Sequence, residues 1–344
     1  MLDHTSLPLR ALRSSRARKR TRPLPILYST LRAESIRGLL LRHYDFDDSL
    51  ECIFFCRGVS DTYFVSAGAE RFALKVFRCN WRSEEAILGE LAAIRHVGSK
   101  GVDVAMPVPR RDGRWVCSIR APEGVRKAVL FRWADGRAPK YTDEAQARRY
   151  GALLANLHIA GDDLQPTSAR PRLDANYLFE APVAKVLAHV QRKPTIARDL
   201  QRLVDRTGER LQRAAPELHD WGFCHGDVWS NNARLDGDRL VLFDFDFCGS
   251  GWQIFDLASY RWHARFEKQE DSAWPPFIEG YLQLRPLAAR SLQFIGLFMI
   301  LKQLWTTAHF IGRLPETGAY FLSDDYLENM VPFCERIEAE LIDG

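Results

Sequence analysis

The sequence of 344 residues predicts an α+β fold built from two lobes, a small β-rich lobe followed by a larger helical lobe. Between about residues 50 and 132, runs rich in β-branched and aromatic residues alternate with glycine-containing turns, which is typical of antiparallel strands. From residue 138 onward, apolar residues recur at spacings of three and four, which is typical of helices. The polar segment FRWADGRAPK lies between the two and suits a hinge. We therefore assign residues 25–132 to the first lobe and 133–344 to the second.

The first lobe should contain three consecutive strands and then a helix. Residues 52–78 alternate strand-like runs with a turn at Gly58 and a second turn at AGAE. Because Ser83 can cap a helix and Gly98 can end one, SEEAILGELAAIRHVG predicts a helix between them. Further strands are expected in PVPRRDGRWVC and in KAVLFRW.

The second lobe should begin with a helix over DEAQARRYGALLANLHIA, for which Thr142 is the expected N-cap. Later helices are expected near residues 196–214, 253–268, 287–309 and 323–341. The longest apolar run, FIGLFMIL, is stopped by Lys302 and is far shorter than the roughly 18 residues that span a bilayer. It predicts a buried helix and no membrane segment.

Positive charge is concentrated at the start of the chain. The first 24 residues hold Asp3 as their only acid and seven basic side chains: Arg10, Arg13, Arg16, Arg18, Lys19, Arg20 and Arg22. Since the whole chain has a net charge of +4, the body carries about −2, without the charge excess that binds nucleic acid. We expect residues 1–24 to be a disordered, solvated tail that is dispensable for activity.

The cysteine pattern favours a reduced compartment. The seven cysteines are odd in number and form no CxxC pair, so a disulfide framework is not expected. No long apolar stretch of the kind found in a secretory signal is visible near the start. The simplest interpretation is a cytoplasmic protein.

Acidic and amide side chains gather in FCHGDVWSNNARLDGDRLVLFDFD, residues 223–246, among residues apolar enough to be buried. Buried carboxylates are costly unless they are paired or bound to a metal. The turn at Asp236-Gly237 predicts a short hairpin, which would bring Asn232 and Asp244 together with Asp227 on the loop before it. Two carboxylates and one amide form an oxygen-only set of ligands, which Mg²⁺ prefers.

The segment HGDVWSNN resembles the H-G-D-x-x-x-x-N loop of the aminoglycoside phosphotransferase and choline kinase superfamily, whose fold is protein-kinase-like. The segment LFDFDFCGSGWQIFDLA resembles the metal-binding Asp segment of the same superfamily. The resemblance implies that Asp227 is the catalytic base and that Asn232 and Asp244 are Mg²⁺ ligands. It also implies that His225 is the structural histidine of the loop.

Two further acids in this region receive structural interpretations. Asp246 can reach a second metal or cap the following turn, and we favour the cap. Asp256, in FDLA, corresponds by resemblance to an Asp that holds the backbone amides of the catalytic loop.

The first lobe supplies the expected nucleotide-binding residues. The segment FALK resembles the V-A-I-K strand of protein kinases, which implies that Lys75 binds the ATP phosphates. Strand alternation places Ala73 on the same face as Lys75, where a small side chain leaves room for adenine. Glu90 lies on the buried stripe of the next helix, so we prefer it to Glu84 as the partner of Lys75. The turn with Gly58 should cover the phosphates, although it lacks a complete G-x-G-x-x-G.

The resemblance implies an ATP- and Mg²⁺-dependent phosphotransferase that acts on a hydroxyl of a small molecule, of the aminoglycoside, choline or homoserine type. Two other classes stay open. The segment LKVFRCNWRSEEAILGE resembles bacterial stress-response kinases, which phosphorylate Ser or Thr in proteins. A nucleotide-binding pseudokinase scaffold is the third class, and the complete set of site residues argues against it. The oligomeric state stays open.

Two features near the C-terminus bear on the acceptor. The aromatic residues Trp252, Tyr260, Trp262 and Trp305 could face it, although core packing is the simpler interpretation. The last 21 residues hold seven acids against one arginine, a face that could attract a cationic acceptor but is more typical of solvated helix surface.

Overall fold

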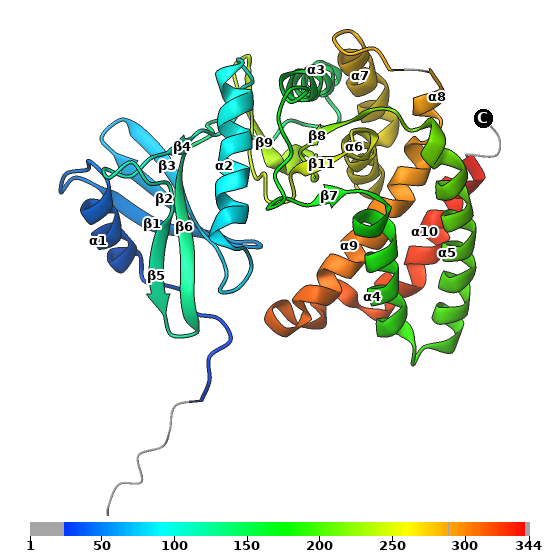
Figure 1. The fold of residues 1–344 in the computed structure, drawn as a ribbon, viewed down its shortest axis with the longest axis horizontal. Coiled ribbons are helices and arrows are strands. Elements are labelled where there is room, and N and C mark those ends of the chain that lie inside the picture. Colours follow the sequence, from blue (N-terminus) through cyan, green and yellow to red (C-terminus); the bar gives the residue numbers. More distant parts are fainter. Residues whose placement is uncertain (1–23, 288, 341–344) are drawn as a thin grey trace, which may run out of the picture.

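The computed structural model describes residues 24–287 and 289–340, which form two lobes (Figure 1). The N-terminal lobe holds a six-stranded sheet, and the C-terminal lobe is mainly helical with two small sheets. This arrangement confirms the predicted α+β fold. The expected basic tail lies outside the described residues, apart from Leu24.

The sheet of the N-terminal lobe is antiparallel and has the order β1-β2-β3-β6-β4, with β5 also paired to β6. Its strands are β1 (Glu51–Arg57), β2 (Asp61–Ala67), β3 (Glu70–Val76), β4 (Pro107–Val108), β5 (Cys117–Ala121) and β6 (Gly124–Arg132). Helix α1 (Ala33–His43) packs on one face of this sheet. Helix α2 (Glu84–Ser99) lies on the side toward the C-terminal lobe (Figure 1), and its apolar residues join the core of that lobe.

The alternation predicted for β3 is confirmed. Phe72, Leu74 and Val76 are buried in the core that the sheet forms with α1. Ala73 and Lys75 therefore point to the opposite face, which is the face turned toward the other lobe. The strand thus delivers Lys75 to the space between the lobes.

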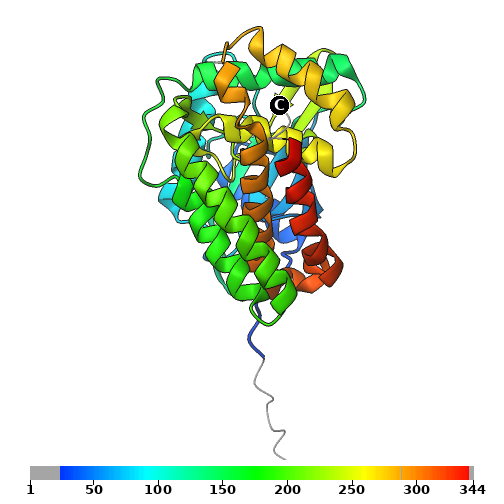
Figure 2. The same cartoon turned by 90° about the vertical axis from the view of Figure 1, so that its right-hand side faces the viewer.

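The C-terminal lobe is built from eight α-helices and five short strands in the described residues. The helices are α3 (Glu144–Ala160), α4 (Ala181–Val190), α5 (Pro194–Ala214), α6 (Ile254–Phe266), α7 (Glu270–Leu282), α8 (Ala289–Leu292), α9 (Ile295–Thr317) and α10 (Asp324–Glu340). The strands are β7 (Arg172–Leu173), β8 (Trp221–Cys224), β9 (Ala233–Asp236), β10 (Arg239–Leu242) and β11 (Gly249–Trp252). Figure 2 shows α4 and α5 beside α9 and α10, which pack against one another.

Several predicted boundaries are confirmed and others are corrected. Ser83 accepts a hydrogen bond from the backbone N–H of Ala86 and caps α2 as predicted. The cap of α3 is Asp143 rather than Thr142, because the Asp143 carboxylate accepts the N–H of Gln146. The helix expected at 287–309 is two helices, α8 and α9, and the Ser291 hydroxyl of α8 donates to the carboxylate of Asp220.

Helix α7 was not predicted, because its sequence contains two prolines, Pro275 and Pro276. Close packing against α3 explains why it forms. A Cβ on Gly151 of α3 would lie 1.9 Å from the carbonyl oxygen of Phe277, and one on Gly280 would lie 2.0 Å from that of Arg148. Backbone contact at two glycines thus brings these helices together, and tertiary packing overrides the weak local propensity.

Helix α9 belongs to the stretch Arg290–Leu322, which is long and apolar enough to cross a bilayer by composition alone. In the structure, 72% of the most apolar 18-residue segment of this stretch is buried inside the lobe, as expected of a helix in a protein core. This agrees with the predicted buried helix over FIGLFMIL. All seven cysteines lie in the described residues and are free.

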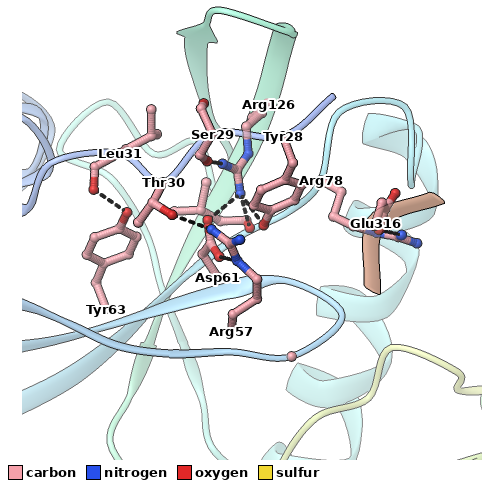
Figure 3. Close-up of polar contacts among 12 residues, drawn as sticks. Tyr28, Ser29, Thr30, Leu31, Arg57, Asp61, Tyr63, Arg78, Arg126 and Glu316 are labelled. Carbon is pink, nitrogen blue, oxygen red and sulfur yellow. Dashed lines mark hydrogen bonds and ion pairs between the residues drawn. The ribbon is translucent and has the colours of Figure 1, made fainter. Parts of the chain in front are cut away.

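The segment 28–31 closes over a buried arginine of the N-terminal lobe (Figure 3). Arg126 of β6 and Asp61 of β2 are both fully buried, and Arg126 Nη2 lies 3.0 Å from Asp61 Oδ2. Arg126 also donates to the backbone oxygen of Ser29 and to the hydroxyl of Tyr28. Since Asp61 begins β2, the segment supports the turn that carries Gly58.

We expect deletion of residues 1–22 to leave ATP turnover and the free energy of unfolding nearly unchanged, because the described contacts of the segment lie beyond it. Deletion of residues 1–31 removes two acceptors of Arg126. An unsatisfied buried donor costs about 1–3 kcal/mol, so the free energy of unfolding should fall by about 2–4 kcal/mol. Urea denaturation of both deletion variants measures this. Equal stability of the two, or lost turnover in the folded shorter deletion, would contradict the prediction.

Candidate active site

A cavity of about 290 Å³ lies between the two lobes. Its N-terminal wall comes from the β1–β2 turn, β3, α2 and the end of β6, and its C-terminal wall from residues 229–246. Together the two walls include all residues predicted to bind nucleotide or metal: Gly58, Ala73, Lys75, Glu90, Asn232 and Asp244. Asp227 is not part of the wall, but it contacts Asn232 directly.

Lys75 joins the two lobes through ion pairs. Its Nζ lies 2.7 Å from Asp244 Oδ1 and 2.9 Å from Asp246 Oδ1. Burial opposes the charge of Lys75, but the two carboxylates and nearby Glu90 outweigh it and hold the pKa of Lys75 above its usual value. Lys75 therefore stays charged at neutral pH and can attract phosphate oxygens in the cavity.

Glu90 does not form the predicted ion pair with Lys75 in the structure. Its nearest cation is Arg170, whose Nη1 lies 3.5 Å from Glu90 Oε2. Burial raises the pKa of Glu90 to about 7, although the charge of Lys75 lowers it. Glu84 pairs with Lys127 at the surface instead. Of the two candidates, Glu90 is thus the one that lines the cavity.

We expect Lys75→Ala to weaken Mg–ATP affinity about 10- to 100-fold, because a hydrogen bond to a charged group contributes about 1.5–3 kcal/mol. Glu90→Gln should have a smaller effect in the same direction, since it removes one charge near Lys75. Glu84→Gln is the matched control and should change nothing, because Glu84 is half-exposed and pairs with Lys127. Calorimetric titration with Mg–ATP measures all three, and a larger effect at Glu84 than at Glu90 would contradict our choice.

Asp227 is held by one cation, Lys302, and by an amide. Lys302 Nζ donates to Asp227 Oδ1 at 2.7 Å, and Asn232 Nδ2 donates to Asp227 Oδ2 at 3.1 Å. His263 Nε2 is 3.8 Å away, too far for a hydrogen bond but close enough to act through the dipole of its ring. Burial lowers the pKa of His263, which keeps the ring neutral at neutral pH. Burial raises the pKa of Asp227, but Lys302 and His263 outweigh burial and lower it well below its usual value. Asp227 is therefore ionised at neutral pH.

Lys302 is a site residue that the sequence analysis did not identify. It lies in α9, 75 positions from Asp227, and its side chain is 1% exposed. The sequence shows it only as the residue that stops an apolar run. A signal was present, because a lysine inside an apolar helix is almost never buried without a partner. Which acid it meets could not be read from the sequence.

The loop that carries Asp227 is anchored by Asp256. The backbone N–H groups of His225 and Gly226 donate to its two carboxylate oxygens at 2.6 and 2.7 Å. His225 Nε2 lies 3.0 Å from the carbonyl oxygen of Phe243, so its ring ties the loop to the hairpin. These contacts agree with the structural roles predicted for both residues: Asp256 binds the backbone amides of the loop, and His225 holds the loop in place.

The predicted hairpin is confirmed and brings Asn232 and Asp244 to one mouth. In the pairing of β9 with β10, Ala233 lies opposite Leu242 and Asp236 lies opposite Arg239. Asn232 precedes Ala233 and Asp244 follows Leu242 by two residues, so both lie at the same end of the hairpin. Asp244 has φ of +65°, in the left-handed region that is unfavourable for most side chains. Such strain persists where the surrounding structure holds it, often at functional sites.

The residues present fit a Mg²⁺ ion that arrives with a nucleotide. In residues 24–287 and 289–340, no three His, Cys, Asp or Glu side chains converge to bind a metal on their own. Asp244 and Asn232 both line the cavity, and the Asp244 side chain is 42% exposed. One or two protein oxygens together with phosphate oxygens are the usual ligands of Mg²⁺ in phosphotransferases.

Asp246 does not cap a turn as we favoured. Its carboxylate is 2% exposed and pairs with Lys75, while its backbone oxygen accepts from Arg82 and Arg170. Burial raises the pKa of Asp246, but Lys75 and the two arginines outweigh burial and lower it. Asp246 is thus a second carboxylate partner of Lys75.

A sequence model of the phosphotransferase enzyme family, known as APH, matches residues 52–291, which is well over half of the chain. The chain belongs to this family. It is therefore an enzyme, a kinase or phosphotransferase, and the family resemblance found in the sequence is confirmed.

Among relatives of this phosphotransferase, a protein of Deinococcus radiodurans described as uncharacterized is 34% identical over 312 residues, covering 89% of this chain and 90% of its own. A homoserine kinase of Neisseria meningitidis is 29% identical over 270 residues, covering 76% and 83%. These matches cover 89% and 76% of this chain, so each extends into both lobes.

Solved structures agree on the fold of this phosphotransferase. A microcompartment-associated aminopropanol kinase superimposes with a TM-score of 0.67 at 21% identity, covering 88% of this chain and 95% of its own. An amicoumacin kinase in complex with AMP-PNP, Ca²⁺ and its substrate superimposes with a TM-score of 0.69 at 20% identity, covering 89% and 93%. Identities this low support the fold and leave the acceptor open.

Proposed function

We propose that this phosphotransferase moves the γ-phosphoryl group of ATP, as its Mg²⁺ complex, to a hydroxyl of a small molecule. The observation that carries the proposal is the cavity wall, where Lys75 of one lobe meets Asp244 and Asp246 of the other. Asp227, next to this wall, supports the role of a base for the acceptor. The names of relatives support a small acceptor over a protein. We also propose a cytoplasmic location, supported by the seven free cysteines.

In this mechanism, Lys75 orients the phosphates, and Asn232 and Asp244 hold the Mg²⁺, whose charge would offset that of the triphosphate. The acceptor oxygen forms a bond to the γ-phosphorus, and the bond from that phosphorus to the β–γ bridging oxygen breaks. The acceptor proton passes to Asp227, and ADP leaves with the electron pair. Lys302 keeps Asp227 ionised and positioned, so it is ready to accept that proton.

A phosphoryl-acceptor screen tests the proposal. Radiolabelled ATP and Mg²⁺ are offered with a panel of hydroxyl-bearing metabolites and antibiotics, and in parallel with generic protein acceptors. Label in a small molecule supports the proposal, and the same reaction with Asp227→Asn identifies label that this site transferred. Label in protein alone would favour the stress-response type of kinase, and no ATP turnover with any acceptor would favour a scaffold.

A further inference from the structure

One face of α9 leads from Asp227 toward the β1–β2 turn. Four residues at spacings of three and four lie on it: Lys302, Thr306, His309 and Arg313. At one end Lys302 contacts Asp227. At the other end Arg313 Nη2 donates to the carbonyl oxygen of Gly58 at 2.6 Å. An acceptor whose hydroxyl reaches Asp227 would therefore extend along this face.

Two arginines of the loop between β3 and α2 lie beside the same face. The ring of Trp81, in that loop, is 6.1 Å from the ring of His309. The guanidinium groups of Arg78 and Arg82 lie over the Trp81 ring at 4.2 and 4.9 Å. We call Arg78, Arg82 and Arg313 the arginine rim.

The arginine rim contains buried donors without acceptors. Among the described residues, five such atoms gather here: the Nε atoms of Arg78, Arg82 and Arg313, the Nε1 of Trp81 and the Oγ1 of Thr306. The Arg78 side chain is only 7% exposed. Buried polar groups in native proteins nearly always have partners, and these atoms are donors, so the absent partner is rich in acceptor oxygens.

Charge points to the same kind of ligand. The arginine rim and Lys302 bring four positive charges. Asp227 pairs with Lys302 and Glu316 pairs with Arg78. The carboxylate near Arg82 and Arg313 is Asp246, which is already paired with Lys75. Burial and the charge of Arg313 lower the pKa of His309 to about 4, so His309 is neutral at neutral pH. Among the described residues, no carboxylate forms an ion pair with Arg82 or Arg313, so positive charge outweighs negative charge around the arginine rim.

We propose that the acceptor alcohol carries an anionic group, such as a carboxylate, which binds the arginine rim while the hydroxyl lies at Asp227. This inference rests on the proposed function and adds the substrate class. The products are ADP and a phosphate ester that retains the anionic group. Cationic acceptors are disfavoured, because like charges placed together repel one another.

The nucleotide does not explain these donors. Neither the arginine rim nor Lys302 lines the cavity that holds Lys75 and Asp244. Lys302 and Arg313 belong to α9, and Arg78 pairs with Glu316 of the same helix. An anionic acceptor would therefore lie along α9.

The eleven positions from Lys302 to Arg313 rise about 16 Å along α9, so the probes must be long. Three eight-carbon probes that differ in charge test the proposal: 8-hydroxyoctanoate, 1,8-octanediol and 8-amino-1-octanol. Acceptor-dependent ADP release is measured, and binding is measured by calorimetry on the full chain loaded with Mg–ADP. We expect the hydroxy acid to bind at least about 10-fold more tightly than the diol, and the amine most weakly. Preference for the amine, equal affinities, or no binding of the hydroxy acid would overturn the inference. Transfer to the amine or diol would still leave the proposed function intact, whereas transfer to protein alone would remove it.

Arginine variants separate anion binding from support of the lobes. Arg313→Gln and Arg82→Gln should raise the KM for 8-hydroxyoctanoate about 10-fold and the KM for 1,8-octanediol much less. Glu316→Gln is the matched control, because it breaks the pair that joins Arg78 to α9 but keeps the cation (Figure 3). It should preserve the preference for the hydroxy acid. If Glu316→Gln and Arg78→Gln lose that preference equally, or if the arginine variants weaken only Mg–ATP binding, the inference is wrong.

Discussion

Asp227→Asn should lower the single-turnover rate of phosphoryl transfer about 10²–10⁴-fold, the usual contribution of a general base, and leave Mg–ATP affinity nearly unchanged. The reason is geometric. Asp227 lies outside the wall of the nucleotide cavity and is bound by Lys302 and Asn232, so its loss affects the acceptor more than the nucleotide. Asparagine keeps the shape of the side chain and its contact with Asn232, but it cannot take a proton.

The measurement is calorimetry with Mg–ATP beside single-turnover transfer to the acceptor found by the screen. Asp238→Asn is a suitable control, because Asp238 is an exposed residue of the hairpin turn whose side chain is 97% exposed. It should leave both quantities unchanged. An equal loss of nucleotide affinity and rate in Asp227→Asn would make Asp227 a metal ligand, and an unchanged rate would remove the proposed mechanism.

Asp244→Ala should damage both nucleotide binding and transfer. Asp244 lines the cavity and holds Lys75 at 2.7 Å, so alanine removes a predicted Mg²⁺ ligand and a partner of Lys75 together. Metal stabilisation of charge contributes several kcal/mol in other enzymes, so we expect the rate to fall by at least about 10²-fold. The affinity for ATP should also lose most of its dependence on Mg²⁺.

Titration of ATP with and without Mg²⁺ tests this assignment. The wild-type protein should bind ATP more tightly with Mg²⁺, and Asp244→Ala should show little difference between the two conditions. Asp246→Ala serves for comparison, because it also loses a partner of Lys75 but is buried away from solvent. It should weaken binding and retain the Mg²⁺ dependence. The reverse pattern would assign the metal to Asp246.

The sequence by itself determined those features that depend on short spacing along the chain. The two-residue periodicity of β3 set the faces of Ala73 and Lys75, and the Asp236-Gly237 turn set the hairpin that joins Asn232 to Asp244. The loop motif located Asp227 within a family pattern. These features are local, because strand alternation and turn geometry need only neighbouring residues.

Only the tertiary structure decided which distant side chains meet. It pairs Lys302 with Asp227, Lys75 with Asp246 and Glu90 with Arg170, across 75, 171 and 80 positions. Such pairs depend on how helices and lobes pack, since a buried charge takes whichever opposite charge the packing brings within reach. The sequence shows that these charges lie in apolar surroundings and need partners. Which partners they find depends on the packing of α2, α9 and the loops around the cavity.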